Sequence, residues 1–153
     1  MADHEQPHPG DGLLNLCFAG TGALVGTSLA ATVLPDTFGI VHAAVSGLLF
    51  AVGTGALLWA YALGVSRSRA VTVTLVGLFF LAGGVAPPDI AQRFRIALAV
   101  EVVVVVVAAA IHPYTNVAFG VLAPMFGLGL MAMWGGRFGS FAVRAVGADH
   151  GSS

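Results

Sequence analysis

The chain has 153 residues, of which 58% are hydrophobic and 8% are charged, and its formal net charge is -1. This content leaves too few polar side chains to cover a water-soluble globule, and it provides no basic stripe that would neutralise nucleic-acid phosphates. We therefore expect a single domain that lies in a lipid bilayer and has no nucleic-acid partner.

Five apolar runs fill most of the chain, and each approaches the roughly 20 residues that a helix needs to cross the hydrocarbon layer. Strands are not expected, because the runs lack the alternation of a transmembrane barrel and an open strand leaves backbone groups unpaired in lipid. The predicted spans are residues 13–34, 40–64, 70–86, 94–111 and 117–134. The predicted fold class is thus an all-α, polytopic transmembrane helix bundle with about five spans. The third, fourth and fifth runs are short, and the alternative is four spans plus one re-entrant or interfacial segment.

The two ends of the chain are polar. Residues 1–12 are predicted to form a disordered tail, residues 13–134 the transmembrane domain, and residues 135–153 a short interfacial segment followed by a disordered tail. Removal of Met1 would place His4 third from a free amine, an arrangement that can hold Cu(II) or Ni(II). We favour chance for this spacing, and no other metal site or cofactor is predicted.

The arginines predict an orientation, since positively charged loops tend to stay in the cytoplasm. With five spans, four arginines fall on one side and two on the other; they are Arg93, Arg95, Arg137 and Arg144 against Arg67 and Arg69. The expectation is a multi-pass protein of the cell membrane with an external N-terminus and a cytoplasmic C-terminus.

Small residues recur at four-residue spacing in the first two runs. They are Gly22 and Gly26 in the first run, and Ala43, Gly47, Ala51 and Gly55 in the second. Small side chains at this spacing let helix backbones approach closely, which gains van der Waals contact in lipid. These faces are predicted to pack either against another helix of this chain or against another protein.

The first run also carries Thr21, Ser28 and Thr32 on one helical face. Interhelical hydrogen bonds, or back-bonding to a carbonyl four residues earlier, are the favoured interpretation. A polar pore lining is the alternative.

Glu101 is the only formally charged residue deep inside a run. An ionised acidic residue at a helix centre costs roughly 2.5 to 3.5 kcal/mol on insertion scales, so its carboxyl group should be protonated or should face a partner or water. His112 follows eleven residues later, which returns to within about 20° of the same helical face. Glu101 and His112 are therefore candidates for a proton or ion path. The alternative is that this face only packs against another helix and buries Glu101 there.

A partner for Glu101 is not evident within its own helix. Arg95 precedes it by six residues, which places the two side chains about 120° apart around the helix. Arg67, Arg93 or His42 from elsewhere could serve instead.

Pro124 interrupts the fifth run, with Gly120, Gly127 and Gly129 close by, and it predicts a kink there. Broken helices in transporters expose backbone groups to a bound ion, but one interruption without a counterpart in the first half of the chain is weak support for such a site.

The stretch of residues 114–141, YTNVAFGVLAPMFGLGLMAMWGGRFGSF, resembles the C-terminal part of small uncharacterised multi-pass membrane proteins of actinobacteria. The resemblance depends mainly on residues 124–129 and 134–139. It implies a membrane protein and no particular activity.

No nucleophile elbow, phosphate-binding loop or His and Cys set at metal spacing occurs, so the chain is not predicted to be an enzyme. The first hypothesis is an accessory or scaffold subunit that associates with itself or with a larger membrane complex through its small-residue faces. The alternative is a small transporter or proton conduit that uses Glu101.

Overall fold

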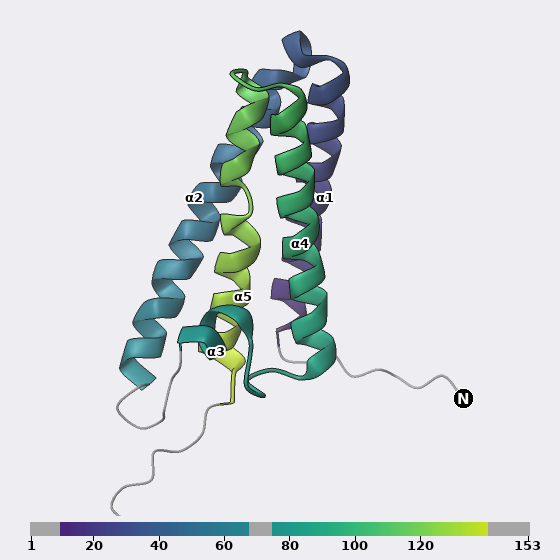
Figure 1. Cartoon of the computed structure of the whole chain (residues 1–153). Helices are drawn as coiled ribbons and strands as arrows, with labels where there is room; N and C mark the ends of the chain where they lie inside the picture. Colours follow the sequence, from purple (N-terminus) through teal and green to yellow (C-terminus); the bar gives the residue numbers. More distant parts are fainter. Residues whose placement is uncertain (1–9, 68–74, 141–153) are drawn as a thin grey trace, which may run out of the picture.

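The computed structural model describes residues 10–67 and 75–140, and every regular element within them is a helix. In chain order the elements are α1 (Asp11–Val33), α2 (Pro35–Arg67), α3 (Leu75–Phe80), α4 (Pro88–Ile111), the 3₁₀ helix η1 (Asn116–Leu122) and α5 (Met125–Phe138). Figure 1 shows them as one elongated bundle, in which η1 and α5 follow one another along a single line. The predicted all-α bundle is confirmed.

Four of the described segments are long and apolar enough to cross a membrane: α1, α2, α4, and η1 together with α5. Many of their large apolar side chains point outward, among them Leu29 on α1, Leu48 on α2 and Val103 on α4, which are 61 to 65% exposed. Outward-facing apolar side chains over this length fit a membrane protein whose solvent is lipid.

Prolines set several of the helix boundaries. The connection between α1 and α2 is the single residue Leu34, after which Pro35 begins α2. Pro88 begins α4 in the same way, and Pro113 follows directly after the C-cap of that helix, His112. A proline suits the first position of a helix, where its missing N–H has no intrahelical acceptor, and it cannot continue a helix from within.

The predicted third span, residues 70–86, corresponds in the described part to the six-residue helix α3 and the turn after it. Helix α3 packs against α5, and an added Cβ on Gly135 would lie 2.7 Å from the carbonyl oxygen of Leu78. Arg95 of α4 holds its C-terminal end by donating to the carbonyls of Phe80 at 3.0 Å and Leu81 at 3.3 Å. The fold therefore matches four spans plus one short additional segment.

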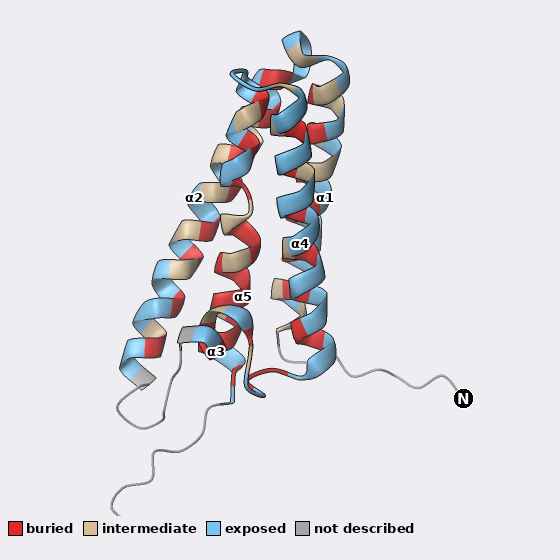
Figure 2. Ribbon diagram, viewed as in Figure 1, coloured by how far each residue is buried: buried red, intermediate tan, exposed pale blue. Residues whose placement is uncertain are grey.

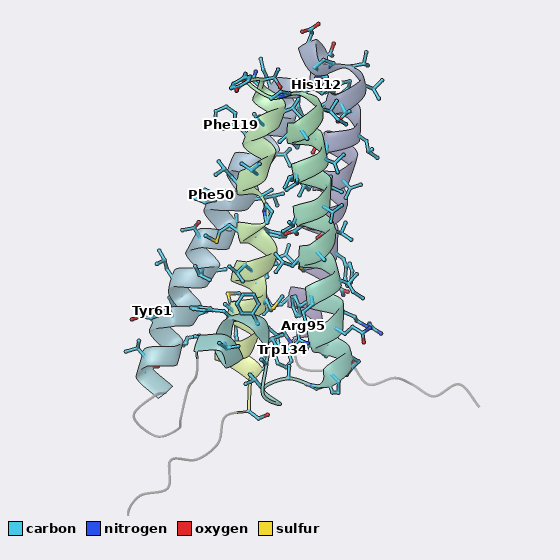
Figure 3. All side chains as sticks on the ribbon, in the orientation of Figure 1. Phe50, Tyr61, Arg95, His112, Phe119 and Trp134 are labelled. Carbon is cyan, nitrogen blue, oxygen red and sulfur yellow. The ribbon has the colours of Figure 1, made fainter. Side chains whose placement is uncertain are left out.

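The bundle has two ends that differ in charge. We call them the Asp36 end, where α1 meets α2 and α4 leads to η1, and the Arg95 end, where α4 begins and α5 ends (Figure 1). In Figure 3, His112 and Phe119 lie towards the Asp36 end, and Arg95 and Trp134 lie at the Arg95 end.

Both α1 and α5 have their outer termini at the Arg95 end. An added Cβ on Gly10, just before α1, would meet the ring of Trp134 near the end of α5. An odd number of spans would place these two helix termini at opposite ends of the bundle.

The segment η1–α5 is central, and Figure 2 shows the largest share of buried positions along it. Its closest neighbour is α2. An added Cβ on Gly129 would collide with the backbone of Gly53, and one on Gly53 would collide with the backbone of Met125. These glycines let the two backbones touch.

The glycines singled out in the sequence do not make this contact. An added Cβ on Gly22, Gly26, Gly47 or Gly55 would have nothing within 4 Å, and Ala51 is exposed. Ala43 is half-buried. The predicted small-residue faces thus lie mainly on the outside of the bundle, and packing inside the chain uses other glycines.

Candidate functional site

Glu101 lies in the middle of α4, and its side chain is completely buried inside the bundle. Two hydrogen-bond donors reach it from different elements. The hydroxyl group of Thr21 on α1 lies 2.8 Å from Oε1, and the backbone N–H of Gly127 on α5 donates to Oε2 at 3.2 Å. The carboxyl group therefore joins three of the four spans at one point.

The N–H of Gly127 can bind Glu101 because the last span is interrupted between η1 and α5. Pro124 is the N-cap of α5. The N–H groups on either side of Gly127 have local backbone acceptors, since Phe126 donates to the carbonyl of Ala123 and Leu128 to that of Pro124. The first N–H groups of a helix have no intrahelical acceptor, and they carry a partial positive charge that favours a carboxylate. Pro124 thus creates a helix N-terminus in the middle of the bundle.

Glycine at position 127 allows the carboxyl group of Glu101 to come this close to the backbone of α5. An added Cβ there would lie 2.6 Å from Glu101 Oε2. Any side chain at this position would displace the carboxyl group from the α5 terminus.

Thr21 can form a hydrogen bond with either protonation state of Glu101. Its Oγ1 is also 2.9 Å from the carbonyl oxygen of Cys17, so its single hydroxyl proton has two acceptors within reach. When Glu101 is ionised, Thr21 donates to it. When Glu101 is protonated, Thr21 accepts from it and donates to Cys17 instead.

The buried polar side chains of the described chain all lie at Glu101 or between it and the Asp36 end. They are Thr21, Ser28, His42, Ser46 and Glu101. Three buried atoms among them have no hydrogen-bond partner, namely Ser28 Oγ, Ser46 Oγ and His42 Nε2. An unpartnered polar atom in an apolar interior costs free energy unless water binds it, and Thr54 Oγ1 on α2, next to Gly53, is a further such atom.

His42 presents one ring nitrogen to this interior. Its Nδ1 is 3.3 Å from the hydroxyl of Thr27, whose own proton is taken up by the Ala23 carbonyl at 2.8 Å. Thr27 accepts from Nδ1–H in one tautomer of His42; in the other tautomer Nδ1 is the acceptor and Nε2–H is the donor, directed towards the backbone of Val117 on η1. Nε2 faces η1, where an added Cβ on Gly120 would lie 2.6 Å from it.

The opposite half of the core, between Glu101 and the Arg95 end, is filled by apolar side chains. Its large members include Phe94, Phe126, Leu130, Met131 and Trp134, each no more than 4% exposed. The indole N–H of Trp134 is unpartnered but lies next to Gly10 at the end of the bundle. We call this region the apolar half and the region on the other side of Glu101 the polar half.

His112, the second candidate of the sequence, is the C-cap of α4, at the Asp36 end. Its Nε2 is 3.0 Å from the carbonyl oxygen of Thr32 on α1. Glu101 and His112 thus face the same neighbour, α1, as their spacing requires, but they lie at different depths. His112 fastens two helix ends together, whereas Glu101 is the buried group.

The three cationic partners suggested by the sequence do not account for the hydrogen bonds of Glu101. Arg93 is exposed, His42 binds Thr27, and the side chain of Arg67 lies outside the described side chains. Residue 4 is likewise outside the described range, so His4 stays a sequence prediction. In the described part, no group of three or more His, Cys, Asp or Glu residues is placed to hold a metal ion.

Sequence reasoning missed the partnership of Thr21 and Gly127 with Glu101. The signals were present, since Thr21 lies on the polar face of the first run and Gly127 follows the kink by three residues. Comparison with models of protein families, with curated proteins and with solved structures finds no match for the chain.

Proposed function

We propose that this chain is a small membrane transporter that takes up protons on Glu101 from the Asp36 end. The observation that carries the proposal is the set of contacts around the carboxyl group. A helix N-terminus and a hydroxyl stabilise the ionised form, and the switch of Thr21 between Glu101 and Cys17 keeps the protonated form hydrogen-bonded. A group that is accommodated in both states can gain and lose a proton without opening the bundle.

The polar half provides a route between that group and the Asp36 end. The unpartnered atoms of Ser28, Ser46 and His42 can each bind water, and His42 Nε2 can also accept a proton. Buried ionisable groups in transmembrane helices commonly mark such relays.

The apolar half argues for a transporter instead of an open channel. Phe94, Phe126 and Met131 fill the core between Glu101 and the Arg95 end with side chains that cannot pass a proton onward. A site open towards one side only is the arrangement that alternating access requires. The break at Pro124, close to Gly127, is the place where the last span can pivot.

Proton uptake into proteoliposomes, followed with an internal pH dye under an imposed membrane potential, tests the proposal. Glu101→Gln should abolish uptake, while its carbonyl oxygen still accepts from Gly127 N–H and its amide NH2 donates to Thr21. Asp89→Asn, at the exposed start of α4, is the matched control that should not abolish uptake. Thr21→Val should slow uptake at least tenfold, and Thr21→Ser, which retains the hydroxyl, should not. Equal uptake by the parent chain and by Glu101→Gln would refute the role of Glu101.

We also propose that the Arg95 end faces the cytoplasm. Arg93, Arg95 and Arg137 lie at this end, Arg67 ends α2 there, and Arg69 and Arg144 follow in sequence the helices that end there. At the Asp36 end, the two connections and the first turn of α2 contain no arginine and one formal charge, that of Asp36. With four spans the arginine count is therefore six against none, a much stronger bias than five spans allowed.

Labelling of single introduced cysteines tests this orientation. Asn116→Cys, exposed at the Asp36 end, should react with a membrane-impermeant thiol reagent in intact cells. Arg93→Cys, exposed at the Arg95 end, should react only after the membrane is opened. Cys17 is buried and is not expected to contribute. The reverse pattern would invert the topology.

The second candidate function is that of an accessory subunit that associates through its small-residue faces. It is favoured by the outward position of Gly22, Gly26, Gly47 and Gly55, because an exposed glycine stripe in lipid allows close contact with another helix. Gly22→Leu and Gly55→Leu should leave the isolated bundle stable and disrupt any complex, as measured by crosslinking in native membranes. Unchanged crosslinking would remove this candidate.

A further inference from the structure

An open groove of about 1070 Å³ lies at the Asp36 end, well apart from Glu101. The start of α2, the end of α4, the connection between α4 and η1, and η1 itself form its walls. Its lining combines apolar side chains with a few polar ones. Those that bear on its occupant are Asp36, Ile40, Tyr114, Phe119, Val121 and Leu122.

Hydrogen bonds hold the connection that forms one wall of the groove. Thr115 donates to the carbonyl of His112 at 2.8 Å and accepts from the N–H of Val117 at 3.3 Å, which caps η1. His112 is in turn bound to α1 through the carbonyl of Thr32. The groove is therefore preformed, which lowers the entropy cost of binding.

The lining indicates the charge of the occupant. Asp36, in the first turn of α2, is the only formally charged residue that lines the groove, so its charge favours a cationic ligand over an anionic one. Tyr114 and Phe119 add aromatic rings, which attract cations, and Ile40, Val121 and Leu122 supply apolar surface. One carboxylate does not provide the oxygen ligands that Ca²⁺ or Mg²⁺ needs.

We propose that this groove binds a free organic cation, a drug-sized molecule with an apolar body and one positive charge. The charge lies at Asp36 and the body lies along Phe119 and Leu122. The volume of the groove lies just above the roughly 300 to 1000 Å³ that is usual for sites of such molecules. Cation binding in the groove is a property separate from proton uptake and does not depend on Glu101.

The two sites share a wall, because η1 lines the groove on one side and presents Gly120 to His42 on the other. A cation bound in the groove therefore contacts the same short helix that borders the polar half. This places a second ligand beside the proposed proton route without adding a residue to it.

Equilibrium binding to the full chain in nanodiscs tests the inference, with tetraphenylphosphonium as the probe and no pH gradient. Tetraphenylborate, an anion of the same shape, is the matched ligand. The phosphonium should bind saturably and the borate should bind at least tenfold more weakly. Asp36→Asn should weaken phosphonium binding about tenfold, which corresponds to about 1.4 kcal/mol, and Asp36→Glu should restore it.

Control variants distinguish binding in the groove from binding elsewhere on the protein. Phe119→Ala should also weaken binding, whereas Asp89→Asn at the other end and Glu101→Gln should bind like the parent chain. Equal affinity for both ions, or no effect of Asp36→Asn, would overturn the inference. Binding of the protein to phosphatidylcholine vesicles, with no binding of the phosphonium, would also overturn the inference. Because the assay needs no proton movement, its failure is distinguishable from failure of the proposed function.

Discussion

The polar half and the apolar half of the bundle are built from the same four spans, yet their interiors differ. Between Glu101 and the Asp36 end the core contains Ser28, His42 and Ser46 with unpartnered atoms, and the last span is the narrow 3₁₀ helix η1. Between Glu101 and the Arg95 end the core is apolar and the last span is the α-helix α5. The difference teaches that the break at Pro124 marks a boundary between two kinds of interior as well as a kink.

The boundary itself is the most sensitive place, and the largest effect is expected there. Gly129→Val should prevent recovery of folded protein, because the new side chain would collide with the backbone of Gly53 and neither helix can yield locally. Gly55→Val on α2, with nothing within 4 Å, is the matched control and should fold normally. Thermal unfolding in detergent measures both. Similar stability of the two variants would contradict the close crossing of α2 and α5.

Opening the apolar half should convert the proposed transporter into a leak. Phe126→Ala removes a buried ring that packs against Gly20, and it should cost about 3 kcal/mol or more in the free energy of unfolding. It should also raise passive proton permeability in proteoliposomes. Leu48→Ala, on the exposed surface of α2, should do neither. If the proton permeability of Phe126→Ala equals that of the parent chain, this ring does not block proton movement through the apolar half.

A substitution in the polar half should have the opposite effect: the rate of proton uptake should change, and the free energy of unfolding should change little. Ser46→Ala removes a buried hydroxyl that has no partner, so the free energy of unfolding should change by less than about 0.5 kcal/mol. Proton uptake should slow severalfold. Ser66→Ala, at the exposed end of α2, serves as the control. Unchanged uptake in Ser46→Ala would remove Ser46 from the proposed route.

The smallest effect is expected at the Arg95 end, outside both interiors. Arg95→Gln removes the donors to Phe80 and Leu81 and should cost about 1 kcal/mol, since the guanidinium group is exposed. Hydrogen exchange of the α3 amides should speed up while that of α4 stays the same. Arg93→Gln is the control on another face of α4. If the α3 amides of Arg95→Gln exchange as slowly as those of the parent chain, Arg95 does not stabilise the C-terminal end of α3.

The presence of membrane helices could be predicted from the sequence, because the length and hydropathy of each run are local properties. The interruption at Pro124 could be predicted as well, since a proline cannot donate the backbone hydrogen bond of a helix interior. Glu101 stood out for the same kind of reason, as the one charge deep within an apolar run. Each of these features depends on a residue and its immediate neighbours.

Tertiary structure alone decided which faces meet. Nearly every face of these helices is apolar, so periodicity does not distinguish the inner face from the lipid-facing one, and Gly22 and Gly55 were indistinguishable in sequence from Gly53 and Gly129. In the described part, the third run contains the short helix α3, which Arg95 and α5 contact from elsewhere in the chain. The partners of Glu101 are 80 and 26 residues away along the chain, and a hydrogen bond over that separation exists only once the helices have packed.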